Sequence, residues 1–252
     1  MRVAVIGGTG LTGRHTVRAL EESSHEAVVV ARSRGVDVTT GAGLEAALAG
    51  ADAVIDVTNT AARDAGTARK FFAGTTKTLL AAEARVGVGH HVVLSIVAVD
   101  QVPGSAHYAG KRAQEEGALA GPIPVTVLRA TQFHEFARLV VGWTLRDGSA
   151  IVPPLLVQPV AARDVGRALA ATAVGSPMGR APDLAGPEPQ DLVDMARRTL
   201  AARGESVRLI PSWRGPLGAE MAGEVLLPGP DAQIAPTTFD AWLASEDVAN
   251  LT

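Results

Sequence analysis

The stretch at residues 3–14 constrains the fold more than any other part of the chain. A short apolar, β-branched run leads directly into a turn with glycines at positions 7, 10 and 13, and a helical pattern follows. The first glycine permits a tight turn, the second lets a pyrophosphate approach the backbone, and the third lets the helix pack closely on the strand. Free amide groups at the start of that helix would face the phosphates. The stretch therefore predicts the first βα unit of a dinucleotide-binding domain, and its candidate coenzyme contacts are Gly7, Thr9, Gly10, Leu11, Thr12 and Gly13.

Composition and charge exclude several classes of protein. The 252 residues are 47% hydrophobic and 19% charged, which suits one large α/β domain. The absence of cysteine excludes disulfides, thiolate catalysis and cysteine-based zinc sites. The net charge is −3 and no basic tract is visible, so we expect no direct binding of nucleic acid. No run reaches the ~20 apolar residues of a membrane helix, and no signal-peptide layout is present, so we expect a cytoplasmic protein, monomeric or homodimeric.

The end of the second predicted strand, residues 27–30, indicates which coenzyme would be preferred. An acidic residue at this place would bind the adenosine ribose of NAD, whereas arginine accommodates the 2′-phosphate of NADP. The chain has no acid there and instead carries Arg32, Ser33 and Arg34. A guanidinium binds phosphate through bidentate, charge-assisted hydrogen bonds. We therefore expect NADP (NADPH), with NAD less favoured; the alternative is that both arginines are solvated loop charges.

The rest of the N-terminal part alternates between strands and helices. We expect a very short strand at 35–39, in which Asp37 is a further candidate coenzyme contact, and buried strands at 53–57, 91–96 and 124–129. Thr58 and Asn59 follow the strand at 53–57, where the ribose of a coenzyme would lie. Helices are expected between the strands, at 43–49, 71–86 and 106–119. This alternation predicts a Rossmann-type, doubly wound parallel α/β sheet.

Beyond residue 130 the pattern changes. We expect one NAD(P)-binding domain over residues 1–252, to which 131–160 and 176–252 contribute a small C-terminal substrate lobe. Helices are predicted at 132–146, 162–174 and 191–203, with a Pro- and Gly-rich loop at 175–190. The first of these helices carries an apolar stripe that we expect to be core, formed by Phe133, Phe136, Leu139, Val140 and Trp143.

Three segments, together with the glycine turn, carry a family resemblance. They are Leu94-Ser95-Ile96-Val97, the stretch from Ala106 to Glu115, and Leu128-Arg129-Ala130-Thr131-Gln132-Phe133. The chain resembles the atypical short-chain dehydrogenase/reductases, and within them the NmrA-like, NAD(P)H-binding group. The resemblance covers about the first 170 residues well and the tail poorly.

The resemblance implies a Ser–Tyr–Lys arrangement. The tyrosine would protonate a carbonyl oxygen while the nicotinamide gives hydride, and the lysine would hold the nicotinamide ribose and lower the pKa of the tyrosine. Ser95 and Lys111 match two of these positions. The family spacing places the tyrosine four residues before the lysine, but His107 stands there and Tyr108 is only three residues before it.

Three interpretations of this departure stay open. Tyr108 substitutes through a small helix rotation, or His107 is the acid, or the acid has been lost. Lys111 as a ribose contact survives in all three.

The segment after the strand at 124–129 is expected near the nicotinamide. Thr131 is a candidate coenzyme contact, and Gln132, Phe133 and His134 are candidate substrate contacts. Ala130 stands where many relatives carry proline. His90 and His91 open a strand at the end away from this site, without a second pair at metal-ligand spacing, so we expect no metal.

These features favour an NADP(H)-dependent oxidoreductase that reduces a small quinone-like or carbonyl substrate by hydride transfer. The alternative is a non-enzymatic NADP(H)-binding redox sensor or regulator of the NmrA type, because the expected tyrosine is displaced. A sugar-nucleotide epimerase is a weaker third interpretation, since the tail lacks a convincing nucleotide-sugar pattern.

Overall fold

The computed structural model describes residues 1–215 and 217–249, which form two compact units. The first unit holds Met1–Arg129 and Val165–Pro182, and the second holds Ala130–Asp164 and the described residues from Asp183 onward. None of the helices in the described ranges has both the length and the apolar character needed to cross a membrane. The predicted substrate lobe, 131–160 and 176–252, overlaps the second unit, although residues 216 and 250–252 lie outside the described chain. Its role stays a prediction.

A parallel sheet forms the centre of the first unit. β1 pairs in parallel with both β2 and β3, β3 pairs in parallel with β4, and β5 pairs in parallel with the short β8. The strand order is β5-β4-β3-β1-β2. Nearly every residue of β1, β3 and β4 is buried, as expected for strands covered on both faces. Their bounds are β1 Arg2–Ile6, β2 Glu26–Val30, β3 Ala53–Asp56, β4 His90–Ile96, β5 Val125–Ala130 and β8 Gly179–Arg180.

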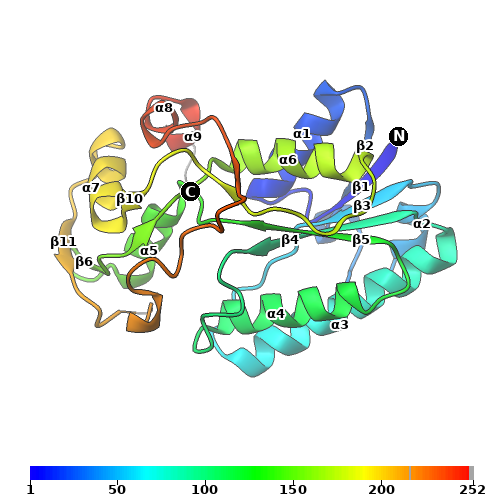
Figure 1. The fold of residues 1–252 in the computed structure, drawn as a ribbon, viewed down its shortest axis with the longest axis horizontal. Helices are drawn as coiled ribbons and strands as arrows, with labels where there is room; N and C mark the ends of the chain where they lie inside the picture. Colours follow the sequence, from blue (N-terminus) through cyan, green and yellow to red (C-terminus); the bar gives the residue numbers. More distant parts are fainter. Residues whose placement is uncertain (216, 250–252) are drawn as a thin grey trace. The chain divides into compact units, whose positions relative to one another are not determined.

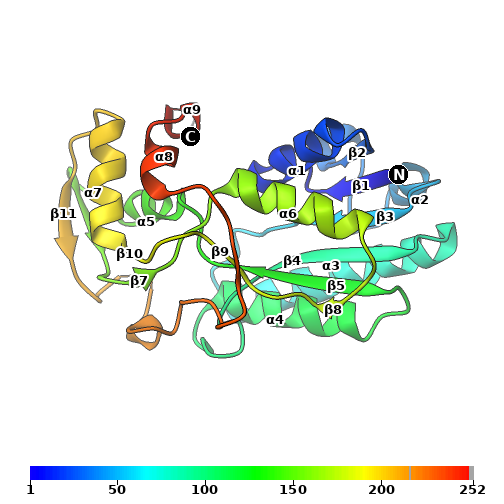
Figure 2. The ribbon, with the colours of Figure 1, turned by 45° about the horizontal axis from the view of Figure 1, so that its top comes forward.

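Helices cover both faces of this sheet. α1 (Leu11–Glu22) and α6 (Ala162–Val174) lie on one face, and α3 (Ala65–Val86) and α4 (Ala106–Leu119) lie on the other (Figures 1 and 2). The short α2 (Leu44–Leu48) turns both of its leucines into the core. The predicted parallel α/β fold is thereby confirmed.

The strand expected at residues 35–39 is wrong. A 3-10 turn at Arg32–Arg34 is followed by a tight loop in which Asp37 makes only an isolated bridge to Ala42. The Asp37 carboxylate accepts hydrogen bonds from the amide and the hydroxyl of Thr39, at 2.8 and 2.6 Å. Such side-chain-to-backbone bonds compete with strand pairing. The helix predicted at 71–86 also begins earlier, because Asp64 caps it at Ala65.

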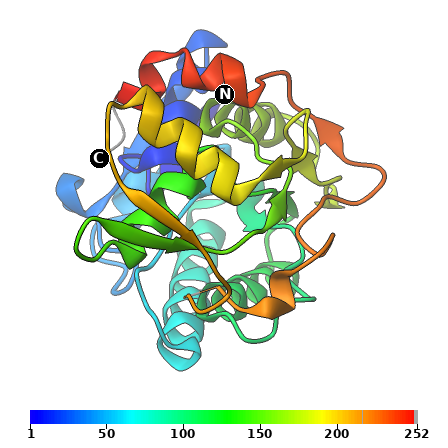
Figure 3. The same ribbon diagram turned by 90° about the vertical axis from the view of Figure 1, so that its left-hand side faces the viewer.

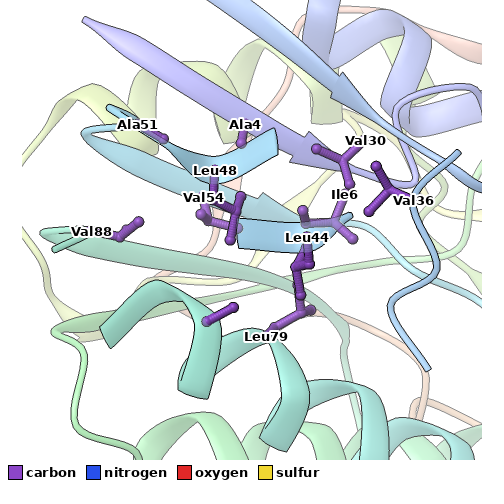
Figure 4. Packing of buried hydrophobic residues seen from close by; sticks show 11 residues of the cluster. Ala4, Ile6, Val30, Val36, Leu44, Leu48, Ala51, Val54, Leu79 and Val88 are labelled. Carbon is purple, nitrogen blue, oxygen red and sulfur yellow. The ribbon is translucent and has the colours of Figure 1, made fainter. Parts of the chain in front are cut away.

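The apolar core under the first three strands is shown in Figure 4. Side chains from β1, β2 and β3 pack against α2 and α3 in this cluster. Its buried members are Ala4, Ile6, Val30, Val36, Leu44, Leu48, Ala51, Val54, Leu79, Ala82 and Val88.

Two glycines fix how α1 sits on β1. Gly7 has φ +81°, a backbone conformation that side chains with a Cβ rarely adopt. A Cβ on Gly13 would lie 2.2 Å from the carbonyl oxygen of Gly7, which leaves no room for it. The helix can therefore approach the turn only because position 13 carries no side chain.

The two histidines that open β4 are both buried. Nδ1 of His91 lies 2.9 Å from Oε1 of Glu83, and both side chains are fully buried. Nε2 of His90 lies 2.9 Å from the Thr126 hydroxyl. Burial lowers the pKa of His91, but the charge of Glu83, its hydrogen bond and the charge of Asp56 together outweigh burial and leave the pKa raised. Each histidine therefore has a polar partner inside the fold.

The second unit holds a small parallel strand pair, β6 (Ser149–Val152) with β11 (Arg208–Pro211). α5 (Phe136–Thr144) and α7 (Leu192–Ala202) pack against each other and against β6 (Figure 3). The remaining short elements are β7 Leu156–Val157, β9 Leu184–Ala185, β10 Gln190–Asp191, a 3-10 turn at Ala219–Met221, β12 Gln233–Ile234, α8 Phe239–Leu243 and α9 Glu246–Ala249.

Three expectations for the chain after residue 130 need correction. The helix predicted at 132–146 begins only at Phe136, because Phe133 bridges to Val160 as an extended residue. The loop predicted at 175–190 contains three short strands. The apolar stripe is only partly core: Val140 is buried, but Leu139 and Trp143 are 48% and 47% exposed.

Helix α8 contributes two rings to an aromatic cluster of the second unit. The rings of Phe239 and Trp242 stack at 5.5 Å, and the His134 ring lies 5.3 and 5.5 Å from them. Glu135 is buried beside this cluster. Burial raises the pKa of Glu135 to about 7, and the charge of Asp247 adds to the rise.

We expect Gly13→Ala to destabilise the protein by about 1–3 kcal/mol, because the added methyl group overlaps the Gly7 carbonyl. Gly74→Ala is the matched control. Gly74 lies within α3, and a methyl group added there would meet no other atom within 4 Å, so this change should stabilise by about 0.5–1 kcal/mol. Urea denaturation measures both free energies of unfolding. Equal effects of the two substitutions would contradict the packing argument.

We expect the pH dependence of stability to report Glu135. Its pKa is higher in the folded chain than the usual 4.5, so its contribution is complete below pH 4.5 and is lost as pH rises through about 7. Glu135→Gln should therefore be more stable than wild type at pH 8, by about 1–3 kcal/mol, and equal to it near pH 4. Melting temperatures at both pH values test this. Glu116→Gln, on the exposed face of α4, should change neither.

Candidate functional site

The carboxyl ends of four strands meet at one edge of the sheet in the first unit. Ile6 pairs with both Val30 and Asp56, and Asp56 pairs with Val93, so β1, β2 and β3 end in the same row and β4 continues three residues beyond it. The chain runs from β1 to β2 on one side and then crosses to β3 on the other. Ligands of open α/β sheets bind at such a switch point, outside the carboxyl ends of the strands.

The glycine turn lies at this switch point. A Cβ on Gly7 would lie 3.2 Å from the carbonyl oxygen of Val57, so the turns after β1 and β3 adjoin. Gly10 caps α1 without a side-chain hydrogen bond, and the first turn of α1 holds no acid. The amide groups of that turn therefore remain available to an anion. Of the predicted contacts, Thr9 belongs to the glycine turn, and Leu11 and Thr12 belong to the first turn of α1.

The arginines after β2 are exposed. Arg32, Ser33 and Arg34 form the 3-10 turn, and within the described ranges neither guanidinium has a hydrogen-bond or ion-pair partner. Asp37 is differently placed. Its carboxylate is bound by Thr39, and these hydrogen bonds lower the pKa of Asp37, with a smaller contribution from the charge of Arg32. Asp37 therefore stabilises its own turn.

The turn after β3 is ordered by its own polar side chains. Oδ1 of Asp56 accepts a hydrogen bond from the amide of Thr58 at 2.8 Å, and Oδ1 of Asn59 accepts one from the amide of Thr60 at 2.8 Å. Thr58 is buried and Asn59 is exposed. The two predicted coenzyme contacts thus lie at the sheet edge beside the glycine turn.

Lys111 reaches the same edge from α4. Its ammonium donates hydrogen bonds to the carbonyl oxygen of Leu94 and to Oε1 of Gln114, both at 2.8 Å, and more weakly to the carbonyl oxygen of Thr58 at 3.4 Å. Burial lowers the pKa of Lys111 to about 8, although the charges of Asp56 and Glu115 oppose this. Lys111 therefore joins the ends of β3 and β4.

His107 and Tyr108 precede Lys111 on α4. His107 is half-buried, with its ring centroid 6.4 Å from that of Phe72, and Tyr108 is buried. Burial and the Lys111 charge lower the pKa of His107 to about 4. His107 is thus neutral at pH 7, and a neutral imidazole is a weak proton donor. This argues against His107 as the acid.

Ser95 lies beside an ion network that sequence analysis missed. Glu115 accepts a bidentate pair of hydrogen bonds from Arg129, at 2.9 and 2.7 Å, and one from Arg180 at 2.5 Å. Burial alone would raise the pKa of Glu115, but hydrogen bonds from Arg129, Ser95 and Arg180 hold it below the usual value. The Ser95 side chain therefore lies beside the Glu115 carboxylate of α4.

Asp56 and Gln114 were also missed. The available signals were an acid at the end of an apolar strand and an amide three residues after Lys111.

The remaining predicted contacts belong to the second unit. Thr131 is buried, and its amide donates to the carbonyl oxygen of Leu184. Gln132 is buried and Phe133 is half-buried. Nε2 of His134 lies 3.3 Å from the carbonyl oxygen of Thr237, inside the aromatic cluster, and burial lowers the pKa of His134 to about 4. This environment favours a packing role for His134.

No cluster of three or more histidine or acidic side chains among the described residues is arranged to hold a metal ion.

Several solved structures share this fold. MoeE5 in complex with UDP-glucose and NAD matches with 21% identity and a TM-score of 0.68, covering 97% of this chain and 92% of its own. UDP-glucuronic acid 4-epimerase from Bacillus cereus, in complex with UDP-glucuronic acid and NAD, matches with 16% identity and a TM-score of 0.73, covering all of both chains. An NADPH-dependent quinone oxidoreductase from Escherichia coli matches with 16% identity and a TM-score of 0.61, covering 83% of this chain and 78% of its own. These similarities concern the fold.

No curated protein sequence matches the chain. The model of the NAD-dependent epimerase/dehydratase family matches residues 3–153, more than half of the chain. The expected resemblance to short-chain dehydrogenase/reductases holds at this broader level, whereas the match does not single out the NmrA-like group. The chain belongs to the NAD-dependent epimerase/dehydratase family.

Proposed function

We propose that the protein is an NADP(H)-dependent oxidoreductase that acts on a small quinone-like or carbonyl substrate, and that it belongs to the NmrA-like group of the atypical short-chain dehydrogenase/reductases. The observation that carries the coenzyme assignment is the pair of exposed arginines after β2, which make no hydrogen bond or ion pair within the described ranges; the nearby Asp37 carboxylate is bound by Thr39. Guanidinium groups so placed suit a 2′-phosphate. The solved neighbours named above include proteins with NAD and one described as NADPH-dependent, so both coenzymes belong in the test.

The chain's own residues would divide the work along the sheet edge. The amides of the glycine turn would hold the diphosphate, and Arg32 and Arg34 would hold the adenosine phosphate. Thr58, Asn59 and Lys111 would contact the ribose region. A bound nicotinamide supplies or accepts a hydride.

The state of His107 and the spacing of Tyr108 bear on the substrate. His107 is neutral at pH 7, and Tyr108 does not stand at the usual four-residue spacing from Lys111. An acceptor that stabilises its own negative charge after hydride transfer, such as a quinone, makes the smallest demand on a protein acid. This favours a quinone over a simple ketone.

We expect Arg32→Asp to weaken binding of NADPH by about tenfold or more, because a charge-assisted phosphate contact is lost and a like charge is introduced. Binding of NADH should change by less than about threefold, since NADH lacks the 2′-phosphate. Calorimetric titration of both coenzymes provides the ratio. Arg14→Ala is the control on the neighbouring glycine turn, where the guanidinium contacts the carbonyl oxygen of Thr9. An equal loss for both coenzymes in Arg32→Asp would overturn the phosphate assignment.

A second candidate is a non-enzymatic NADP(H) sensor, favoured by the neutral His107 in the place of the tyrosine. Steady-state assays with NADPH and a panel of quinones, aldehydes and ketones separate the two. Turnover with a quinone supports the reductase, and tight binding of NADPH without turnover of any acceptor supports the sensor. UDP-glucose belongs in the same panel because the family match and the MoeE5 complex make an epimerase activity worth testing.

A further inference from the structure

One buried polar chain links three segments of the proposed coenzyme site. Gln114 accepts a hydrogen bond from the Lys111 ammonium through Oε1, and donates one through Nε2 to Oδ2 of Asp56, both at 2.8 Å. Oδ1 of the same carboxylate accepts the hydrogen bond from the amide of Thr58 at 2.8 Å. Asp56 and Gln114 are completely buried. The hydrogen bonds thus run from α4 to the turn after β3 through two side chains that have no exposed surface.

Burial of these groups needs a reason other than packing. A buried carboxylate and a buried ammonium each lose their hydration, and such pairs often stabilise a fold less than apolar side chains of the same size would. Gln114 is suited to its place because its amide presents an acceptor to the cation and a donor to the anion. An apolar residue at position 114 would fill the space but would separate the two charges.

We infer that Asp56 and Gln114 are positioning residues of the proposed coenzyme site, which together fix the Lys111 ammonium and the Thr58 amide at the carboxyl ends of β3 and β4. The inference rests on the proposed function, since it assigns this edge to the ribose region. Two protons of the ammonium are held at 2.8 Å by Leu94 and Gln114. The third lies toward the Thr58 carbonyl oxygen, which is 3.4 Å from the nitrogen. A ribose hydroxyl would accept a hydrogen bond from this third N–H group.

Few charged, titratable or aromatic side chains surround Lys111, so the effect of each can be tested separately. Asp56 from β3 and Glu115 from α4 are the acids that act on it, and Glu115 is neutralised by Arg129 and Arg180. His107 is the titratable base on the same helix face, and α3 contributes the Phe72 ring, whose centroid is 4.8 Å from the ammonium nitrogen. Asp56 acts on Lys111 through Gln114, and its charge also reaches the buried His91 of β4, whose pKa it raises.

Lysine titration by NMR reads this pairing directly. The sequence contains three lysines, and the other two, Lys70 and Lys77, are exposed on α3 and serve as internal references. In protein labelled with ¹³C-lysine, we expect Asp56→Asn to lower the pKa of Lys111 by about one unit or more, and Gln114→Glu to raise it by a similar amount. Two shifts of opposite sign cannot come from a general loss of structure. Glu116→Gln, an acid-to-amide change on the exposed face of α4, should leave all three lysines unchanged.

Coenzyme binding provides the second readout. Gln114→Leu and Asp56→Asn should each weaken binding of NADPH by about tenfold, while Glu116→Gln binds as wild type does. If wild type binds no coenzyme, the proposed function fails, and the lysine titration still decides whether Asp56 and Gln114 control Lys111. If wild type binds NADPH and both variants bind it equally well, or if the Lys111 pKa is the same in wild type, Asp56→Asn and Gln114→Glu, the inference is overturned.

Discussion

The close approach of α1 to the turn after β1 is the contact on which the rest of the first unit depends. A single methyl group at position 13 would overlap the carbonyl oxygen of Gly7. Because that overlap is absent, the helix starts directly above the strand end, and its unbonded amides point at the sheet edge. The same turn adjoins the carbonyl of Val57, so the loops after β1 and β3 lie directly against each other. Coenzyme recognition, as proposed, is therefore built from backbone groups, and side chains select among coenzymes.

A different principle governs the α4 side of the edge. There the groups are charged and buried, and each has hydrogen-bond partners: Lys111 bonds to Gln114 on the same helix and to the β4 backbone, and Glu115 bonds to Arg129 and Arg180 on other strands. Buried charges need such partners, because an unpaired one would lose its hydration without compensation. The two networks hold α4 against the strand ends with directional bonds, which apolar packing alone does not provide.

Sequence reasoning succeeded where local pattern decides the structure. The glycine turn, the buried strands and the helix at 106–119 follow from spacing and periodicity, and they appear as predicted. The strand expected at 35–39 failed because the Asp37 carboxylate bonds to Thr39 two residues on, a local competition that hydrophobic alternation does not reveal. The prediction that the apolar stripe on α5 is core failed for a different reason, since periodicity identifies an apolar face but not what covers it. Asp56 and Gln114 were unpredictable as a pair, because 58 positions separate them in sequence.

The division of the chain also has a consequence for how the protein can be dissected. The first unit is completed only by Val165–Pro182, which returns after the chain has entered the second unit. A fragment cut after Arg129 would lack the part of α6 that packs on α1, where a Cβ on Gly166 would lie 2.6 Å from the backbone of His15, and it would also lack β8 on the edge of β5. Such a fragment would expose an apolar helix face and an unpaired strand, the two features that promote aggregation. Neither half is a module that gene truncation can isolate, and recombination between relatives must exchange the interrupted segments together.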